Sequence, residues 1–74
     1  MQELYAEGDK YYYGKEVSQD YQKAIEYYTK AADAGHPDAM KSIGYMYQNG
    51  FGVEQNMQTA MEWYGKAESV RDTK

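Results

Sequence analysis

Few residues in this chain have the types and spacing that suit catalysis or metal binding. Asp33, His36 and Asp38 lie close together in the sequence, but their spacing matches no strong metal site. His36 is the one histidine in a chain that has no cysteine, so a zinc-finger-type site is excluded. A lone histidine in a Gly-His-Pro segment more often serves the turn. We therefore predict that the chain binds no metal and needs no cofactor.

Other chemical motifs are also weak. Gly50-Phe51-Gly52 lacks the Lys-Ser/Thr pair of a phosphate-binding loop, and turn chemistry explains its glycines. The acidic residues Glu54, Glu62 and Glu68 are expected on solvated helix positions, and no serine or cysteine stands with a base at a catalytic spacing. The sequence predicts that the protein is not an enzyme. The opposite hypothesis would require a pocket that gathers acidic groups around His36.

Length and charge limit the remaining classes of function. The 74 residues are predicted to form a single domain (1–74) with a modest core. A net charge of −4 and a pI near 4.8 argue against nucleic acid and anionic membranes as partners, and they permit a basic partner without indicating one. No apolar run approaches the roughly 20 residues that span a bilayer, and the N-terminus does not resemble a signal peptide. We expect a cytoplasmic protein.

Hydrophobic periodicity predicts four helices. The first covers Gln2–Tyr13, and the third covers Asp38–Asn49 after a turn that contains Pro37. Asp20 is the expected N-cap of the second helix, and Asn56 is the expected N-cap of the fourth. The apolar stripe of the second helix consists of Tyr21, Ala24, Ile25, Tyr28, Ala31 and Ala32, and that of the fourth consists of Met57, Ala60, Met61, Tyr64 and Ala67. Both stripes are expected to face inward.

The chain contains an internal repeat with an offset of 36 residues. The pairs related by this offset are Gly8/Gly44, Tyr11/Tyr47, Gly14/Gly50, Val17/Val53, Ala24/Ala60, Glu26/Glu62, Tyr28/Tyr64, Lys30/Lys66 and Ala31/Ala67. A fixed period of this length is typical of stacked structural units. Short turns make successive helices antiparallel neighbours. We predict an all-α fold with repeat one at 3–38, repeat two at 39–70 and a frayed polar tail at 71–74.

The repeated residues resemble the Sel-1-like repeat family, which is related to the tetratricopeptide repeats. The resemblance covers roughly residues 3–68. Repeat two matches the family pattern at Ala39, Ile43, Gly44, Tyr47, Gly50, Gly52, Val53, Ala60, Trp63, Tyr64, Lys66 and Ala67. Repeat one matches it at Gly8, Tyr11, Gly14, Val17, Asp20, Ala24, Tyr27, Tyr28, Lys30, Ala31, Ala32 and Gly35. The resemblance implies an α-solenoid of two helix–turn–helix repeats.

One departure from the family pattern concerns the turn in repeat one. Glu16 stands where repeat two has Gly52. If this turn needs a left-handed residue, Glu16 costs about 1–2 kcal/mol. Otherwise the first turn is built differently from the second.

The resemblance also implies a function. Proteins of this family act as scaffolds that bind other proteins or peptides, often as adaptors, and the first helix of each repeat lines a concave surface. On this chain that surface would hold Tyr5, Asp9, Tyr12, Tyr13, Lys41, Tyr45, Gln48 and Asn49. Aromatic, amide and acidic side chains together suit an extended peptide. In the alternative interpretation, these tyrosines pack between helices or lie on the surface without a ligand.

A second hypothesis is purely structural. In this hypothesis the chain is a structural fragment or a minimal repeat array that associates end to end with copies of itself and has no independent ligand. Met57, Met61, Trp63 and Val70 would supply that interface. A concentration-dependent mass would favour this hypothesis, whereas a stable monomer that captures a ligand would favour the adaptor.

Overall fold

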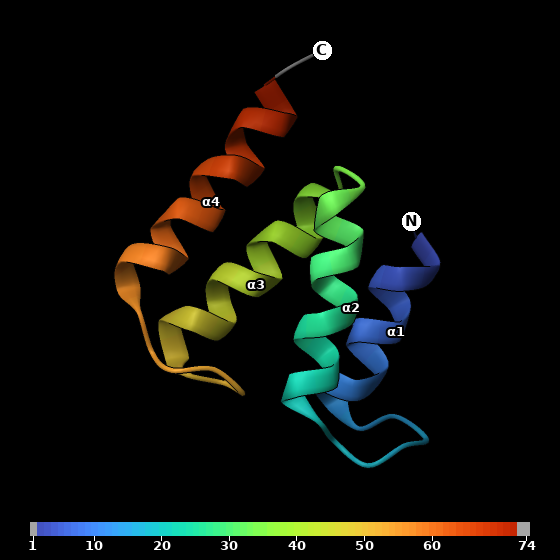
Figure 1. Ribbon diagram of the computed structural model, residues 1–74. Coiled ribbons are helices and arrows are strands. Elements are labelled where there is room, and N and C mark those ends of the chain that lie inside the picture. The colour runs from blue at the N-terminus through green and yellow to red at the C-terminus, as the bar shows by residue number, and fades with distance from the viewer. Residues whose placement is uncertain (1, 73–74) are drawn as a thin grey trace.

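The fold consists of two helical hairpins that lie side by side (Figure 1). The computed structural model describes the backbone of residues 2–72 and the side chains of residues 3–70. Its helices are α1 (Gln2–Tyr13), α2 (Tyr21–Asp33), α3 (Pro37–Asn49) and α4 (Met57–Asp72). α1 packs on α2, α2 on α3, and α3 on α4, so each helix contacts its neighbour in the sequence. This all-α solenoid of two helix–turn–helix repeats is the predicted fold.

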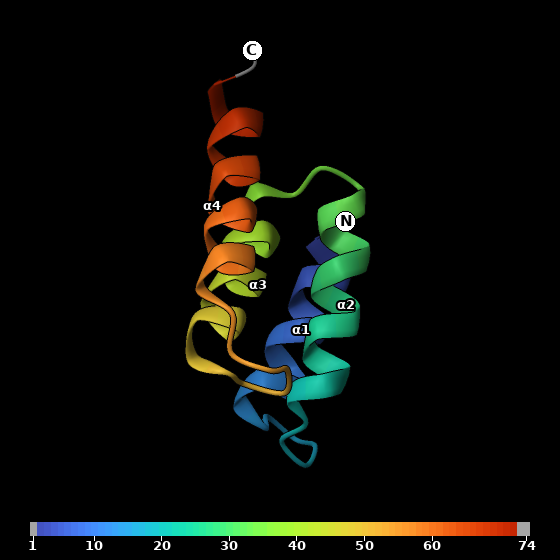
Figure 2. The same cartoon turned by 60° about the vertical axis from the view of Figure 1, so that its left-hand side comes forward.

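The two hairpins form a thin slab whose extents are 36 × 26 × 13 Å. In the view of Figure 2 the α1–α2 hairpin and the α3–α4 hairpin lie beside each other, joined by the turn between α2 and α3. α4 continues through Arg71 and Asp72, which were expected to belong to a polar tail. Residues 73–74 of that tail lie outside the described residues.

The helix boundaries follow from local chemistry. Asp20 Oδ1 accepts a hydrogen bond from the Lys23 backbone N–H at 3.1 Å and caps α2. Asn56 Oδ1 accepts one from the Thr59 N–H at 3.0 Å and caps α4 in the same way. α3 ends at Asn49 and is capped by Gly50, whose φ of +71° is left-handed. The repeat is therefore encoded in the helix ends as well as in the helix faces.

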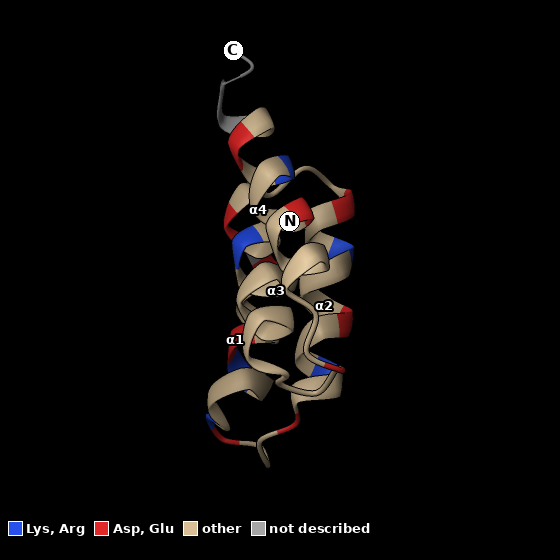
Figure 3. Ribbon diagram, turned by 90° about the vertical axis from the view of Figure 1, so that its left-hand side faces the viewer, with Lys and Arg blue, Asp and Glu red and all other residues tan. Residues whose placement is uncertain are grey.

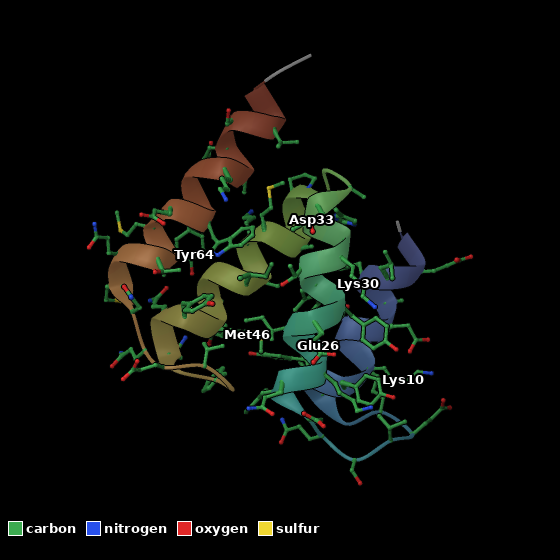
Figure 4. The ribbon with its side chains drawn as sticks, in the orientation of Figure 1. Lys10, Glu26, Lys30, Asp33, Met46 and Tyr64 are labelled. Carbon is green, nitrogen blue, oxygen red and sulfur yellow. The ribbon has the colours of Figure 1, made fainter. Side chains whose placement is uncertain are left out.

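The core lies at the α2–α3 contact and contains small and large side chains. α2 contributes Ala24, Tyr28, Ala31 and Ala32, α3 contributes Ala39, Met40, Ile43 and Met46, and α4 contributes Ala67. The alanines let the helix axes approach closely, while Tyr28, Ile43 and Met46 are the largest side chains that are fully enclosed. Figure 4 labels Met46 on α3, toward α2, and Tyr64 on α4, toward α3.

Two expected core positions on α4 are wrong. Met57 is 52% exposed and Met61 is 64% exposed, although both belong to the predicted apolar stripe. Their equivalents on α2, Tyr21 and Ile25, are half-buried because the next hairpin covers that side of α2. No later hairpin among the described residues covers α4.

The two loops within the hairpins have the same backbone design. The Lys15 N–H donates to the Lys10 carbonyl, and the Phe51 N–H donates to the Met46 carbonyl, both at 2.9 Å. Glu16 has a φ of +64°, close to the +74° of Gly52. The first turn is therefore built like the second, and Glu16 occupies a left-handed conformation that costs about 1–2 kcal/mol for a residue with a Cβ.

Charged residues are interspersed along the helices (Figure 3). Several lysines lie over aromatic rings, as Lys30 Nζ does at 5.4 Å from the Tyr27 ring centroid. Lys10 and Glu7 form an ion pair with an N–O distance of 3.7 Å. No helix in the described part of the chain is long and apolar enough to cross a membrane.

Candidate functional site

An open groove of about 690 Å³ runs between the first helices of the two repeats. α1 lines it with Tyr5, Asp9, Tyr12 and Tyr13, and α3 lines it with Asp38, Lys41, Ser42 and Tyr45. Tyr28 of α2 and Tyr64 of α4 complete the lining. Tyr5, Asp9, Tyr12, Tyr13, Lys41 and Tyr45 are residues that the sequence predicted for the concave surface.

Tyr5 and Tyr12 form the inner wall of the groove. The Tyr5 ring stacks on His36 with a centroid distance of 4.7 Å and lies 5.5 Å from Tyr28. Tyr12 contacts the rings of Tyr21 at 5.5 Å and Phe51 at 6.3 Å. These two tyrosines are half-buried and pack between helices, so they line the groove and also support the core.

Tyr13 and Tyr45 are the exposed rings of the groove. Tyr13 is 63% exposed and Tyr45 is 48% exposed. Tyr13 ends α1, and Tyr45 lies on α3, so each repeat presents one large ring with accessible surface to the same groove. Tyrosines that combine exposed ring area with a hydroxyl are enriched at binding interfaces.

Asp9 is held in place by the core tyrosine of repeat one. The Tyr28 hydroxyl donates to Asp9 Oδ1 at 2.5 Å, which fixes the orientation of this carboxylate in the lining of the groove. Gly8 makes this contact possible, because a Cβ at that position would lie 2.5 Å from Cδ1 of the Tyr28 ring. The glycine is thus needed for the close approach of α1 and α2.

Gln48 and Asn49 are not among the residues that line the groove. Gln48 Oε1 accepts a hydrogen bond from the Tyr64 hydroxyl at 2.7 Å. Asn49 Nδ2 donates to the Tyr45 backbone carbonyl at 2.9 Å and stays exposed. Both side chains thus bond to residues that line the groove.

The charged side chains of the groove are Asp9, Asp38 and Lys41. Burial raises the pKa of Tyr5, Tyr12 and Tyr64 above the usual value for a phenol. Burial, together with the hydrogen bond to Asp9, also raises the pKa of Tyr28. The groove therefore carries two carboxylates and one ammonium group, and the raised pKa values keep the phenols of Tyr5, Tyr12, Tyr28 and Tyr64 neutral at neutral pH.

Sequence reasoning missed Tyr28, Asp38, Ser42 and Tyr64 as groove residues. Tyr28 and Tyr64 were both expected in the core. The Tyr28 ring is packed there and the Tyr64 ring lies against Gly44 of α3, but both residues also line the groove. Asp38, Ser42 and Tyr45 follow i, i+4, i+7 spacing on α3, so helical phase alone could have grouped Asp38 and Ser42 with Tyr45.

His36 belongs to the turn before α3. It is 8% exposed, and its backbone N–H donates to the Ala31 carbonyl at 3.1 Å while its carbonyl accepts from the Met40 N–H at 3.2 Å. Among the described residues no group of three His, Cys, Asp or Glu side chains is arranged to hold a metal ion.

The fold and groove define an all-helical repeat protein, and comparison with known families identifies the repeat. A model of the Sel1 repeat matches residues 3–36 and again residues 37–69. The chain therefore belongs to the Sel1 repeat family. Sel1 repeats are generally protein–protein interaction modules.

Individual relatives are much longer than this chain. HRD3A of Arabidopsis thaliana, an ERAD-associated E3 ubiquitin-protein ligase component, is 40% identical over 45 residues, which are 61% of this chain and 7% of HRD3A. Protein sel-1 homolog 2 of Mus musculus is 44% identical over 46 residues, again 61% of this chain and 7% of the relative. The chain thus spans less than a tenth of the length of these relatives.

A solved structure shares the fold over nearly the whole chain. The crystal structure of a Sel1 repeat protein from Oxalobacter formigenes superposes with a TM-score of 0.84 at 35% sequence identity. The match covers 93% of this chain and 28% of that protein. The helix arrangement described above is thus that of a solved Sel1 array.

Proposed function

We propose that this chain is a non-catalytic interaction module whose groove binds a peptide or an exposed segment of a partner protein. The observation that carries the proposal is that Tyr13 of repeat one and Tyr45 of repeat two present exposed ring surface to one groove. A volume of about 690 Å³ lies within the usual range of about 300–1,000 Å³ for ligand sites. HRD3A, which belongs to a ligase assembly, is a relative whose described role agrees with protein binding.

Selection from a random peptide display library, with the whole chain as bait, tests the proposal. Affinities of the selected peptides are then measured by fluorescence anisotropy for the native chain and for Tyr45→Ala. Because Tyr45 is exposed, its truncation should leave the fold intact and weaken binding about tenfold or more, as expected for a central aromatic contact. Circular dichroism verifies that the variant keeps its helices.

Met61→Ala is the matched control, since Met61 is also large, exposed and on a helix but does not line the groove. It should bind the selected peptides as the native chain does. Peptides that bind Tyr45→Ala and the native chain equally well would place the binding surface elsewhere, and a library that yields no binder would remove the support for a peptide-binding role.

Self-association through α4 is a second candidate, favoured by the exposed pair Met57 and Met61. These residues correspond to Tyr21 and Ile25 by the repeat offset. On α2 that side is covered by the next hairpin, and Phe51 stacks on Tyr21 with a centroid distance of 5.0 Å. A second copy of the chain could cover α4 in a comparable manner.

Glu16 opposes this form of self-association. If a second copy placed its first hairpin on α4 as α3 lies on α2, its Glu16 would take the place of Gly52. A Cβ on Gly52 would lie 2.5 Å from Tyr21 Cβ, so that position has no room for a side chain. We therefore rank peptide binding first.

Sedimentation equilibrium over a wide concentration range tests the second candidate. We expect a monomer for the native chain and a concentration-dependent rise in mass for Glu16→Gly, which Met61→Glu should reverse. A native chain that already associates, and that Met61→Glu returns to a monomer, would place self-association first.

A further inference from the structure

We propose that the groove recognises the guanidinium group of an arginine in the partner, with Asp9 as its counter-ion and Tyr45 as a ring on which it stacks. The inference rests on the proposed function and specifies the chemistry of the ligand.

The first argument is the balance of charge in the groove. Asp9 and Asp38 lie in the lining together with Lys41, so carboxylates exceed ammonium groups by one. Both carboxylates also act electrostatically on the Tyr5 hydroxyl, Asp9 from α1 and Asp38 from α3, so both lie near this ring of the groove. A partner group with a positive charge complements this arrangement.

The second argument is the state of the Asp9 carboxylate. Asp9 is half-buried, and the Tyr28 hydroxyl donates to one of its oxygens, Oδ1. A carboxylate accepts about four hydrogen bonds in total, so the Asp9 group has acceptor capacity for further donors from a ligand. Its orientation is fixed before binding, which reduces the entropy cost of recognition.

The third argument concerns the rings. On its own surface this chain places Lys23 over Tyr11, Lys30 over Tyr27 and Lys66 over Trp63, at 4.4–5.5 Å from the ring centroids. Among the described residues no cation lies over Tyr45, which is 48% exposed and meets Phe51 only edge-on at 5.9 Å. A cation from a partner can therefore use this ring face.

Arginine fits these features better than lysine. Its planar guanidinium stacks on an aromatic ring and donates two parallel hydrogen bonds to a carboxylate. A lysine ammonium is a compact and strongly hydrated charge, so it should bind this open, water-accessible groove more weakly than a guanidinium does.

The test compares two acetylated and amidated pentapeptides, Gly-Gly-Arg-Gly-Gly and the same peptide with citrulline, the neutral isostere of arginine. Binding is followed by two-dimensional NMR of the tyrosine ring protons and the backbone amides. We expect the arginine peptide to shift the Tyr45 signals and to bind about tenfold more tightly than the citrulline peptide.

Variants of the chain sharpen the test because they should act in opposite directions. Asp9→Asn keeps the size of the side chain and an oxygen that can accept from Tyr28, yet it should remove most of the preference for arginine over citrulline. The exposed variant Asp38→Asn should weaken arginine binding about threefold, and the exposed variant Lys41→Gln should strengthen it about twofold. These two exposed sites keep the test valid if Asp9→Asn fails to fold.

Equal binding of the arginine and citrulline peptides would overturn the inference, as would tighter binding of a Gly-Gly-Glu-Gly-Gly peptide through Lys41. Failure of this inference differs from failure of the proposed function. If the library yields peptides that lack arginine and still require Tyr45, the groove binds peptides but does not recognise guanidinium. If no peptide binds, both are wrong.

Discussion

Repeat one and repeat two share a backbone design but differ in how completely they are enclosed. Tyr28 is 2% exposed because α1, α2 and α3 surround it, whereas its equivalent Tyr64 is half-buried on the last helix of the chain. The Tyr28 hydroxyl donates to the charged Asp9, and the Tyr64 hydroxyl donates to the neutral amide of Gln48. Identical residues at equivalent positions therefore contribute differently to stability, since the neighbouring hairpin and not the repeat itself completes the core.

The loops within the two hairpins also differ in how far the rest of the chain covers them. Gly52 lies against Tyr21 at the start of α2, whereas Glu16 is exposed, although both have positive φ. A side chain is tolerated at position 16 because no described hairpin lies against that loop. The predictions that follow test this difference between the repeats, beginning with the largest expected effect.

Gly52→Ala should be the most destabilising of the changes considered. A Cβ there costs about 1–2 kcal/mol for the left-handed backbone. The clash with Tyr21 adds about 1–3 kcal/mol by overpacking. Urea denaturation followed by circular dichroism at 222 nm should show a large loss of the free energy of unfolding.

In the equivalent loop, Glu16→Gly should raise the free energy of unfolding by about 0.5–1 kcal/mol, because it relieves strain without removing a contact. Similar effects of the two changes would contradict the comparison.

Gly8→Ala should destabilise the chain by about 1–3 kcal/mol, and more than Gly44→Ala does. The new Cβ at position 8 meets the enclosed Tyr28 ring at 2.5 Å, while that at position 44 meets the half-buried Tyr64 ring at 2.8 Å, which has more room to move. Gly65→Ala is the control, because nothing lies within 4 Å of its Cβ and alanine favours a helix by about 1 kcal/mol. Thermal unfolding should therefore give a lower Tm for Gly8→Ala, a smaller decrease for Gly44→Ala and a higher Tm for Gly65→Ala.

Tyr28→Phe should cost about 1.5–3 kcal/mol, since it removes a hydrogen bond to a charged acceptor and leaves the half-buried Asp9 without that donor. Tyr64→Phe removes a hydrogen bond to a neutral amide and should cost about 0.5–1.5 kcal/mol. Chemical denaturation of both variants under one set of conditions measures the difference. If Tyr64→Phe proves the more damaging, the enclosed position of Tyr28 does not set the energetics.

Raising the pH should leave the free energy of unfolding unchanged near neutrality and should lower it increasingly above about pH 10. The pKa of Tyr28 is raised in the folded chain, whereas an unfolded tyrosine ionises near its ordinary value of 10.0. Below that value both states hold the proton. Above it the unfolded state loses the proton first, so the free energy of unfolding decreases by at most about 1.4 kcal/mol per pH unit for each such group. Tyr28→Phe should show a shallower decrease between pH 10 and 11 than the native chain does, and an equal slope would contradict this assignment.

The sequence was sufficient for the fold because its signals are local and occur twice. The caps at Asp20 and Asn56, the glycine at Gly50 and the spacing of the apolar residues set the helix boundaries without reference to the rest of the chain. The helical phase of α1 also predicted Tyr5, Asp9, Tyr12 and Tyr13 on one side. These features depend on the geometry of a single helix or turn.

Tertiary structure decided which of these surfaces are covered. Met57 and Met61 have the same helical phase as Tyr21 and Ile25, yet they are exposed because burial depends on the following hairpin. Tyr28 of α2 and Tyr64 of α4 joined the groove only when these helices were packed against α1 and α3. The sequence alone determined the repeat, its helices and its turns, since these depend on residues a few positions apart. The three-dimensional packing determined the lining of the groove and the open side of α4, because burial and side-chain hydrogen bonds depend on residues that are distant in the sequence.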